Sequence, residues 1–205
     1  MKTTTELIVI PEAEDRRTAP FSRVLTANRP VALSLAVLVF AVLTALGAHI
    51  AVPLGFTPVP MTLQTLFVLL AGLLLGPAAG AASQLIYLGL GVTGVPVFAM
   101  GAAGLPWLFG PTGGYLMAFP AAAALAGWIA GRDGHRIRTG AALVAATALI
   151  FTLGADWLSV VTELGSREVF AAGVQPFLPG ALIKAGIAWV VARQTVARTL
   201  RSRSR

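Results

Sequence analysis

The chain is organised as long apolar runs separated by short stretches rich in glycine, proline or arginine. A helix that crosses the hydrocarbon core of a bilayer needs about 20 mostly apolar residues. Six runs reach or approach that length, and proline or glycine interrupts the chain between most of them. We predict six membrane-spanning helices, at residues 31–50, 61–75, 78–92, 111–131, 139–161 and 178–197. The second and third runs are short, so these helices must borrow residues from their flanks.

Charged residues are almost absent from the middle of the chain. Residues 30–131 contain no Lys, Arg, Asp or Glu, and 11% of the whole chain is charged while 57% is hydrophobic. Soluble domains carry roughly 25% charged residues, which cover their surfaces. The pattern therefore excludes a soluble enzyme and predicts an all-α integral membrane protein, a six-helix bundle. Residues 1–30 form a predicted cytoplasmic tail, 31–198 the membrane domain and 199–205 a basic C-terminal tail.

The net charge of +7 comes from clusters of basic residues beside the apolar runs. Five of the 15 basic residues precede residue 30, three lie between Arg132 and Arg138, and five lie between Arg193 and Arg205. Basic residues flank membrane spans on the cytoplasmic side. An even number of spans and this distribution predict that both termini are cytoplasmic. The clusters are explained by membrane topology, so we expect no nucleic-acid partner.

Sequence motifs for catalysis and for nucleotide binding are missing. The chain has no cysteine, no HExxH and no Walker A sequence, and its two histidines lie far apart. No set of nucleophile, base and acid appears, and the common sequence motifs for a zinc site and for nucleotide binding are missing. We therefore predict a protein that is not an enzyme and that uses no metal and no cofactor.

Two stretches rich in glycine and proline are predicted to lie on the non-cytoplasmic side, at residues 51–60 and 93–110. With their flanks they read GFTPVPMTLQ and GVPVFAMGAAGLPWLFGPTGGY. Non-helical backbone near a membrane must be buried in protein or line a cavity, because lipid offers it no hydrogen-bond partner. The stretches bring neutral polar groups and aromatic rings, which commonly line small-molecule pockets. These groups are Phe56, Thr57, Thr62, Gln64, Phe98, Trp107, Thr112 and Tyr115. The alternative is ordinary connecting loops with interfacial aromatic residues.

Lys184 and Asp156 are ionisable groups predicted to lie well inside the spans, away from the span ends. An ionisable residue inside a membrane is a candidate functional residue. Lys184 is predicted in the outer half of the sixth span, where its ammonium suits a substrate carboxylate. Asp156 is predicted in the outer half of the fifth span. The two side chains could instead neutralise each other across the helices.

Small residues recur at intervals of four in the first span and around the second. Ala32 and Ala36, Ala41 and Ala45, and the series Gly72, Gly76 and Gly80 share this spacing. Small residues at this spacing let membrane helices approach closely. Both packing within one bundle and a groove for another membrane subunit fit this pattern.

Taken together, PVPMTLQTL, GPTGGY and FLPGALIKAG closely resemble the BioY family, with a similarity that covers most of residues 40–190. BioY proteins are biotin-specific substrate-binding (S) components of energy-coupling factor (ECF) transporters. The resemblance implies a six-helix bundle in the bacterial or archaeal cell membrane, with a vitamin pocket open to the outside. It also implies partnership with a transmembrane coupling subunit and two ATPase subunits. The AxxxA pattern that faces the coupling subunit is matched by Ala41 and Ala45, with Ala32 and Ala36 as a second candidate.

The resemblance also implies residues for biotin binding. The family pattern PGDLIK reads PGALIK here, so Lys184 matches and Ala181 replaces an aspartate. We hypothesise that Lys184 holds the biotin carboxylate and that Asp156 supplies the missing charge. Candidate partners for the ureido ring are Gln64, Gln84, Tyr87, Thr112 and Tyr115.

Other functions stay open at this point. They are an S component for a different vitamin, a membrane scaffold subunit without a ligand and, least supported, an intramembrane enzyme. Contact with the lipid bilayer follows from the spans, and a homo-oligomer remains open.

Overall fold

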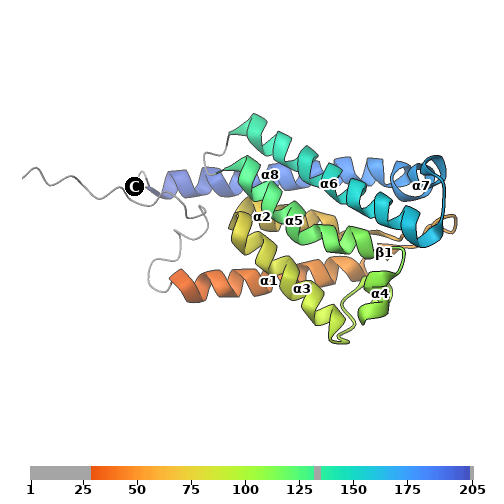
Figure 1. Ribbon diagram of the computed structural model, residues 1–205. Coiled ribbons are helices and arrows are strands. Elements are labelled where there is room, and N and C mark those ends of the chain that lie inside the picture. The colour runs from red at the N-terminus through yellow and green to blue at the C-terminus, as the bar shows by residue number, and fades with distance from the viewer. Residues whose placement is uncertain (1–28, 132–134, 204–205) are drawn as a thin grey trace, which may run out of the picture.

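The computed structural model describes residues 29–131 and 135–203, and it shows a bundle of helices that run along a common axis (Figure 1). Six long or medium helices lie where the apolar runs predict them. They are α1 (Arg29–His49), α2 (Gln64–Leu75), α3 (Pro77–Val92), α5 (Gly113–Ala130), α6 (Arg136–Thr162) and α8 (Leu178–Arg203). The predicted N-terminal tail up to residue 28, residues 132–134 of the basic loop and the last two residues of the C-terminal tail lie outside the described residues.

Four segments of the described chain are long and apolar enough to cross a membrane, at Pro30–His49, Gly113–Ala130, Arg136–Thr162 and Ser166–Thr195. α2 and α3 are shorter, with 12 and 16 residues. At about 1.5 Å per residue, α2 extends only about 18 Å. It lies among α1, α3, α5 and α8, and most of its residues are buried. Its apolar character therefore reflects burial inside the bundle.

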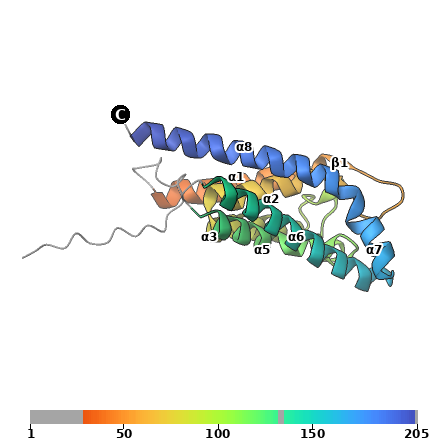
Figure 2. The same ribbon diagram turned by 90° about the horizontal axis from the view of Figure 1, so that it is seen from above.

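The connections from α1 to α2, from α3 to α5 and from α6 to α8 gather at one end of the bundle (Figure 1). A short antiparallel pair of strands, β1 (Ala51–Val52) and β2 (Met61–Thr62), lies there with α4 (Leu105–Phe109) and α7 (Ser166–Gly173) (Figure 1). Two 3₁₀ turns, η2 (Ala99–Gly101) and η3 (Gln175–Phe177), complete the connections. Figure 2 shows α8 along one side of the bundle, with its C-terminal end away from α7.

The observed helix limits differ from the predicted ones at several places. The second helix begins at Gln64 instead of Met61, because Met61 and Thr62 pair with β1. α7 was not predicted; the side chain of Glu168 accepts a hydrogen bond from the N–H of Gly165 at its first turn. α8 continues to Arg203, beyond the predicted end at residue 197.

The glycine series around α2 packs inside this bundle. A Cβ on Gly72 would lie 2.2 Å from the carbonyl oxygen of Ala123 in α5, and a Cβ on Gly127 would lie 2.6 Å from the carbonyl oxygen of Gly72. A Cβ on Gly80 in α3 would lie 2.9 Å from the Cα of Gly72. These contacts between backbones decide between the two interpretations of the series: Gly72 and Gly80 serve packing within the chain.

Candidate functional site

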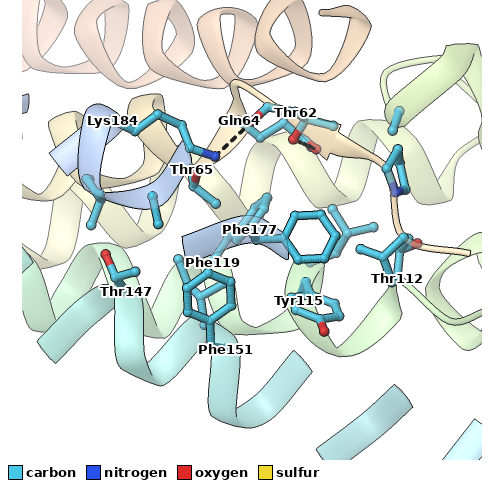
Figure 3. A pocket seen from close by; sticks show the side chains of 17 residues that line it. Thr62, Gln64, Thr65, Thr112, Tyr115, Phe119, Thr147, Phe151, Phe177 and Lys184 are labelled. Carbon is cyan, nitrogen blue, oxygen red and sulfur yellow. Dashed lines mark hydrogen bonds between the residues drawn. The ribbon is translucent and has the colours of Figure 1, made fainter. Parts of the chain in front are cut away.

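A pocket opens between α2, α5, α6 and α8, beside the β1–β2 strand pair. Aromatic rings from three segments form much of its wall, at Tyr115, Phe119, Phe151 and Phe177 (Figure 3). Polar groups are few and mostly neutral. They are Thr62, Gln64, Thr65, Thr112, Tyr115, Thr147 and Lys184. An apolar wall with a few placed polar groups is the usual construction of a small-molecule site.

Lys184 carries the positive charge of the pocket. Its Nζ donates a hydrogen bond to the main-chain carbonyl oxygen of Thr62, at 2.9 Å, and so connects α8 with β2 (Figure 3). Within the described residues, the structure records no ion pair for this ammonium. An ammonium has three N–H groups, so two remain for a ligand. The arrangement favours an anionic group at this point.

Gln64 is held in place by hydrogen bonds on both sides of its amide. The hydroxyl of Thr62 donates to Oε1 at 2.9 Å, and Nε2 donates to the hydroxyl oxygen of Tyr87. Tyr87 is fully buried behind the pocket, with its ring edge-on to Phe98 at 5.7 Å. Tyr87 therefore positions Gln64 and does not itself line the pocket. One N–H of the Gln64 amide remains for a ligand.

A Tyr87→Phe substitution tests this support. The variant keeps the packed ring and removes the acceptor of Gln64, so we expect a loss of about 1 kcal/mol of stability. The midpoint of thermal unfolding should fall by about 2–4 °C. Thr93→Val is the control, because Thr93 is exposed and its hydroxyl bonds only the adjacent turn. An unchanged midpoint in the Tyr87 variant would show that the bond contributes nothing.

The GPTGGY motif shapes one wall of the pocket. A Cβ on Gly113 would lie 1.6 Å from the carbonyl oxygen of Leu108, and a Cβ on Gly114 would lie 2.2 Å from the Cβ of Trp157. Trp157 Nε1 donates to the carbonyl oxygen of Gly110 at 3.0 Å. Gly114 lets α5 lie close against α6, and Gly113 lets it lie close against the backbone of Leu108 in α4. The two glycines thereby position Thr112 and Tyr115 at the pocket wall.

Tyr115 is fixed by contacts beyond the motif. Its hydroxyl donates to the carbonyl oxygen of Gly173 at 2.8 Å. Its ring lies on Gly154, where a Cβ would approach within 2.2 Å of Cδ1. The ring is therefore the part of Tyr115 that is offered to a ligand, because the hydroxyl is already bonded.

Four of the predicted substrate-binding residues meet in the pocket: Gln64, Thr112, Tyr115 and Lys184. Gln84 does not. It is fully buried between α1 and α3, where its Oε1 accepts from Thr44 at 3.3 Å and its Nε2 donates to Ser83 at 3.0 Å. Gln84 thus joins two helices, and Tyr87 acts only through Gln64.

The predicted compensation by Asp156 is corrected by the structure. Asp156 is exposed and is not among the residues that line the pocket. At about 100° per residue, it lies roughly 180° around α6 from Thr147, which does line the pocket. A side chain on that face cannot supply charge to Lys184. The sequence did not indicate which face of α6 points into the bundle, because apolar residues occur all around this helix.

The predicted contact of small alanines with a coupling subunit is also corrected in part. Ala41 is 1% exposed and Ala36 is 9% exposed, so both are covered by this chain's own helices. Ala32 and Ala45 are partly exposed. In each AxxxA pair, therefore, only one alanine is accessible to another subunit, namely Ala32 in one pair and Ala45 in the other.

Several lining residues were missed in the sequence. They are Thr65, Phe119, Thr147, Phe151 and Phe177, and Ala181 lines the pocket as a bare methyl group. Most of them lie in apolar runs, where one threonine or phenylalanine does not stand out. The spacing of Thr147 and Phe151, four residues apart, is the signal of a shared helix face. That signal is too common in membrane helices to identify a site.

The comparisons with known proteins point to one family. A model of the BioY family matches residues 21–201. The probable biotin transporter BioY of Pyrococcus horikoshii is 41% identical over 163 residues, which cover 80% of this chain and 95% of the relative. The biotin transporter BioY of Thermotoga maritima is 37% identical, over 75% of this chain and 89% of the relative.

A solved structure is similar as well. It is the crystal structure at 2.1 Å of the S-component for biotin from an ECF-type ABC transporter. The TM-score is 0.74 at 28% identity, and the match covers 83% of this chain and 93% of the other.

Proposed function

Because this chain belongs to the BioY family, we propose that it is a biotin-binding S component that serves biotin uptake across the cell membrane. It is a multi-pass membrane protein of the transporter class. The observation that carries the proposal is Lys184, an ammonium without an ion pair in the described residues, set in an aromatic pocket.

The pocket matches the chemistry of biotin group by group. Biotin carries a carboxylate on an aliphatic chain, an apolar ring with sulfur, and a ureido group with two N–H donors and one acceptor. Lys184 suits the carboxylate, and the rings of Phe119, Phe151 and Phe177 suit the apolar part. Gln64 and Thr112 are the proposed partners of the ureido group, and the Tyr115 ring packs beside it.

The transport machinery that we propose has further subunits. The chain carries no Walker A sequence, so energy from ATP must come from other proteins. We propose a transmembrane coupling subunit and two ATPase subunits as these partners. Ala32 and Ala45 are the proposed small-residue contacts on α1, since Ala36 and Ala41 are covered.

We also propose the topology. Six helices form the membrane domain, with α2 packed inside the bundle, and both termini lie in the cytoplasm of a bacterial or archaeal cell. The basic residues support this orientation, because 13 of the 15 lie before residue 30, between Arg132 and Arg138, or from Arg193 onward. The pocket then faces outward, since the β1–β2 strand pair, α4 and α7 lie at the other end of the bundle (Figure 1).

Equilibrium binding of radiolabelled biotin to the detergent-purified protein tests the function. We expect saturable binding with one site per chain, which unlabelled biotin displaces and which a large excess of thiamine or riboflavin does not. Displacement by another vitamin would favour an S component of different specificity, in line with the methyl group of Ala181 at the pocket wall. Absence of binding at micromolar biotin would contradict the proposal.

A further inference from the structure

The hydroxyl of Thr147 in α6 is the unusual polar group of the pocket. Threonines inside helices commonly donate to the carbonyl oxygen four residues earlier. Thr44, Thr139 and Thr162 do so, at 2.8, 3.1 and 2.6 Å. Thr147 Oγ1 is buried and has no hydrogen-bond partner among the residues that the structure describes. A buried hydroxyl without a partner is unfavourable. Thr147 lines the pocket, so rotation of its side chain about Cα–Cβ would turn Oγ1 toward a ligand that satisfies it.

Thr147 also lies at the inner end of the pocket. Of the residues of α6 that line the pocket, it is the farthest from the end at Thr162, about 22 Å along the helix axis. On α8, Lys184 is likewise the lining residue farthest from Leu178. Figure 3 shows Thr147 and Lys184 on the same side of the cavity, with Thr112 on the opposite side. The two polar groups thus mark the depth that an entering ligand reaches last.

A carboxylate at this depth needs more donors than one lysine. An ionised carboxylate offers about four acceptor sites, and burying it is favourable only when those sites are hydrogen-bonded. Leu69 and Phe119 also line the pocket and offer none. Ala181 offers none either, because its side chain is a methyl group. The free hydroxyl of Thr147 is a donor of the required kind, and Thr65 on α2 offers a second hydroxyl beside Lys184 (Figure 3).

We propose that Thr147 donates a hydrogen bond to the ligand carboxylate that Lys184 binds, and so helps to select a carboxylate ligand. This inference rests on the proposed function, because it names a second contact in the same biotin site. It assigns the hydroxyl of Thr147 to the carboxylate end of the ligand.

The first test compares biotin affinity in Thr147→Val, Thr147→Ser and the wild type. A hydrogen bond to a charged group contributes enough that the valine variant should bind at least tenfold more weakly. Serine keeps the hydroxyl and should stay within about threefold of the wild type. Thr152→Val is the matched control on the same helix, because Thr152 is exposed. Unchanged affinity in Thr147→Val would overturn the inference.

Thermal unfolding without biotin gives a second readout, in which we expect Thr147→Val to be no less stable than the wild type although it binds biotin more weakly. Removing a buried hydroxyl that has no partner relieves a cost, so Thr147→Val should unfold at the same temperature as the wild type or a few degrees higher. A lower unfolding temperature together with weaker binding would show a structural role and would overturn the inference.

A ligand analogue locates the contact. In this analogue, a methyl group replaces the carboxylate of biotin. We expect Thr147→Val and the wild type to bind it equally, because the group that Thr147 contacts is gone. Equal losses for biotin and for the analogue would place the contact elsewhere and overturn the inference. Failure of the wild type to bind biotin at all would instead contradict the proposed function.

Discussion

A Lys184→Met variant is expected to bind biotin at least a hundredfold more weakly than the wild type, a loss of about 2.7 kcal/mol. Methionine keeps a long unbranched apolar side chain but has no ammonium. The carboxylate would then enter the pocket without a cation and with fewer hydrogen-bond donors, which is costly in a site largely removed from water. Equilibrium binding of radiolabelled biotin to both purified proteins measures the effect.

The control for this variant is Asp156→Asn, which also removes one formal charge. Asp156 is exposed on the far side of α6 from the pocket. The Asp156→Asn variant should therefore bind biotin with the same affinity as the wild type. If Lys184→Met binds biotin as tightly as the wild type, the proposed transport function stands. Lys184 would then not be a contact of the ligand. Weakened binding by Asp156→Asn would restore the idea that these two residues compensate each other.

Gly72→Ala is expected to produce the largest loss of stability. The new methyl group would lie 2.2 Å from the carbonyl oxygen of Ala123 and 2.9 Å from the Cβ of Ala126. Both obstacles belong to α5, so relief requires a shift of one helix against the other. Overpacking of this kind costs about 3 kcal/mol, which corresponds to a fall of about 6–12 °C in the midpoint of thermal unfolding.

Gly89→Ala is the matched control for this variant. Gly89 lies inside α3, and a Cβ there meets nothing within 4 Å. Alanine in the interior of a helix is favoured over glycine by roughly 0.5–1 kcal/mol, so the midpoint should stay the same or rise. Equal midpoints in the two variants would show that α2 and α5 can separate at little cost.

Helix positions and family membership were accessible from the sequence, because both rest on extended patterns. Apolar runs near the length of a membrane span predicted the six main helices to within a few residues. The motifs PVPMTLQTL and GPTGGY indicated the BioY family, and the family model and relatives confirm it. The glycines of GPTGGY occupy places where a Cβ would collide with α6 or with Leu108. A motif of this kind is recognisable because packing allows few alternatives.

Side-chain direction was not accessible in the same way. The apolar spans have polar residues on no particular face, so hydrophobic periodicity could not tell which side of α6 or α1 lies inward. Asp156 and Ala41 were therefore assigned to the wrong surroundings, and Thr147 was overlooked. Gln64 and Gln84 were equal candidates as buried amides. Only the folded chain distinguishes them, since one reaches the pocket and the other joins α1 to α3.

The direct contact of backbones between α2 and α5 restricts how this chain can vary over evolution. At Gly72 and Gly127 even one added carbon collides with main-chain atoms, so no neighbouring side chain can shrink to make room. Mutations there cannot be rescued by a second substitution nearby, as they can where two side chains share a volume. The exposed residues of α6, such as Val144 and Val160, can exchange among aliphatic types independently. Amino-acid substitutions should therefore accumulate fast on the outside of the bundle and very slowly along the contact between α2 and α5.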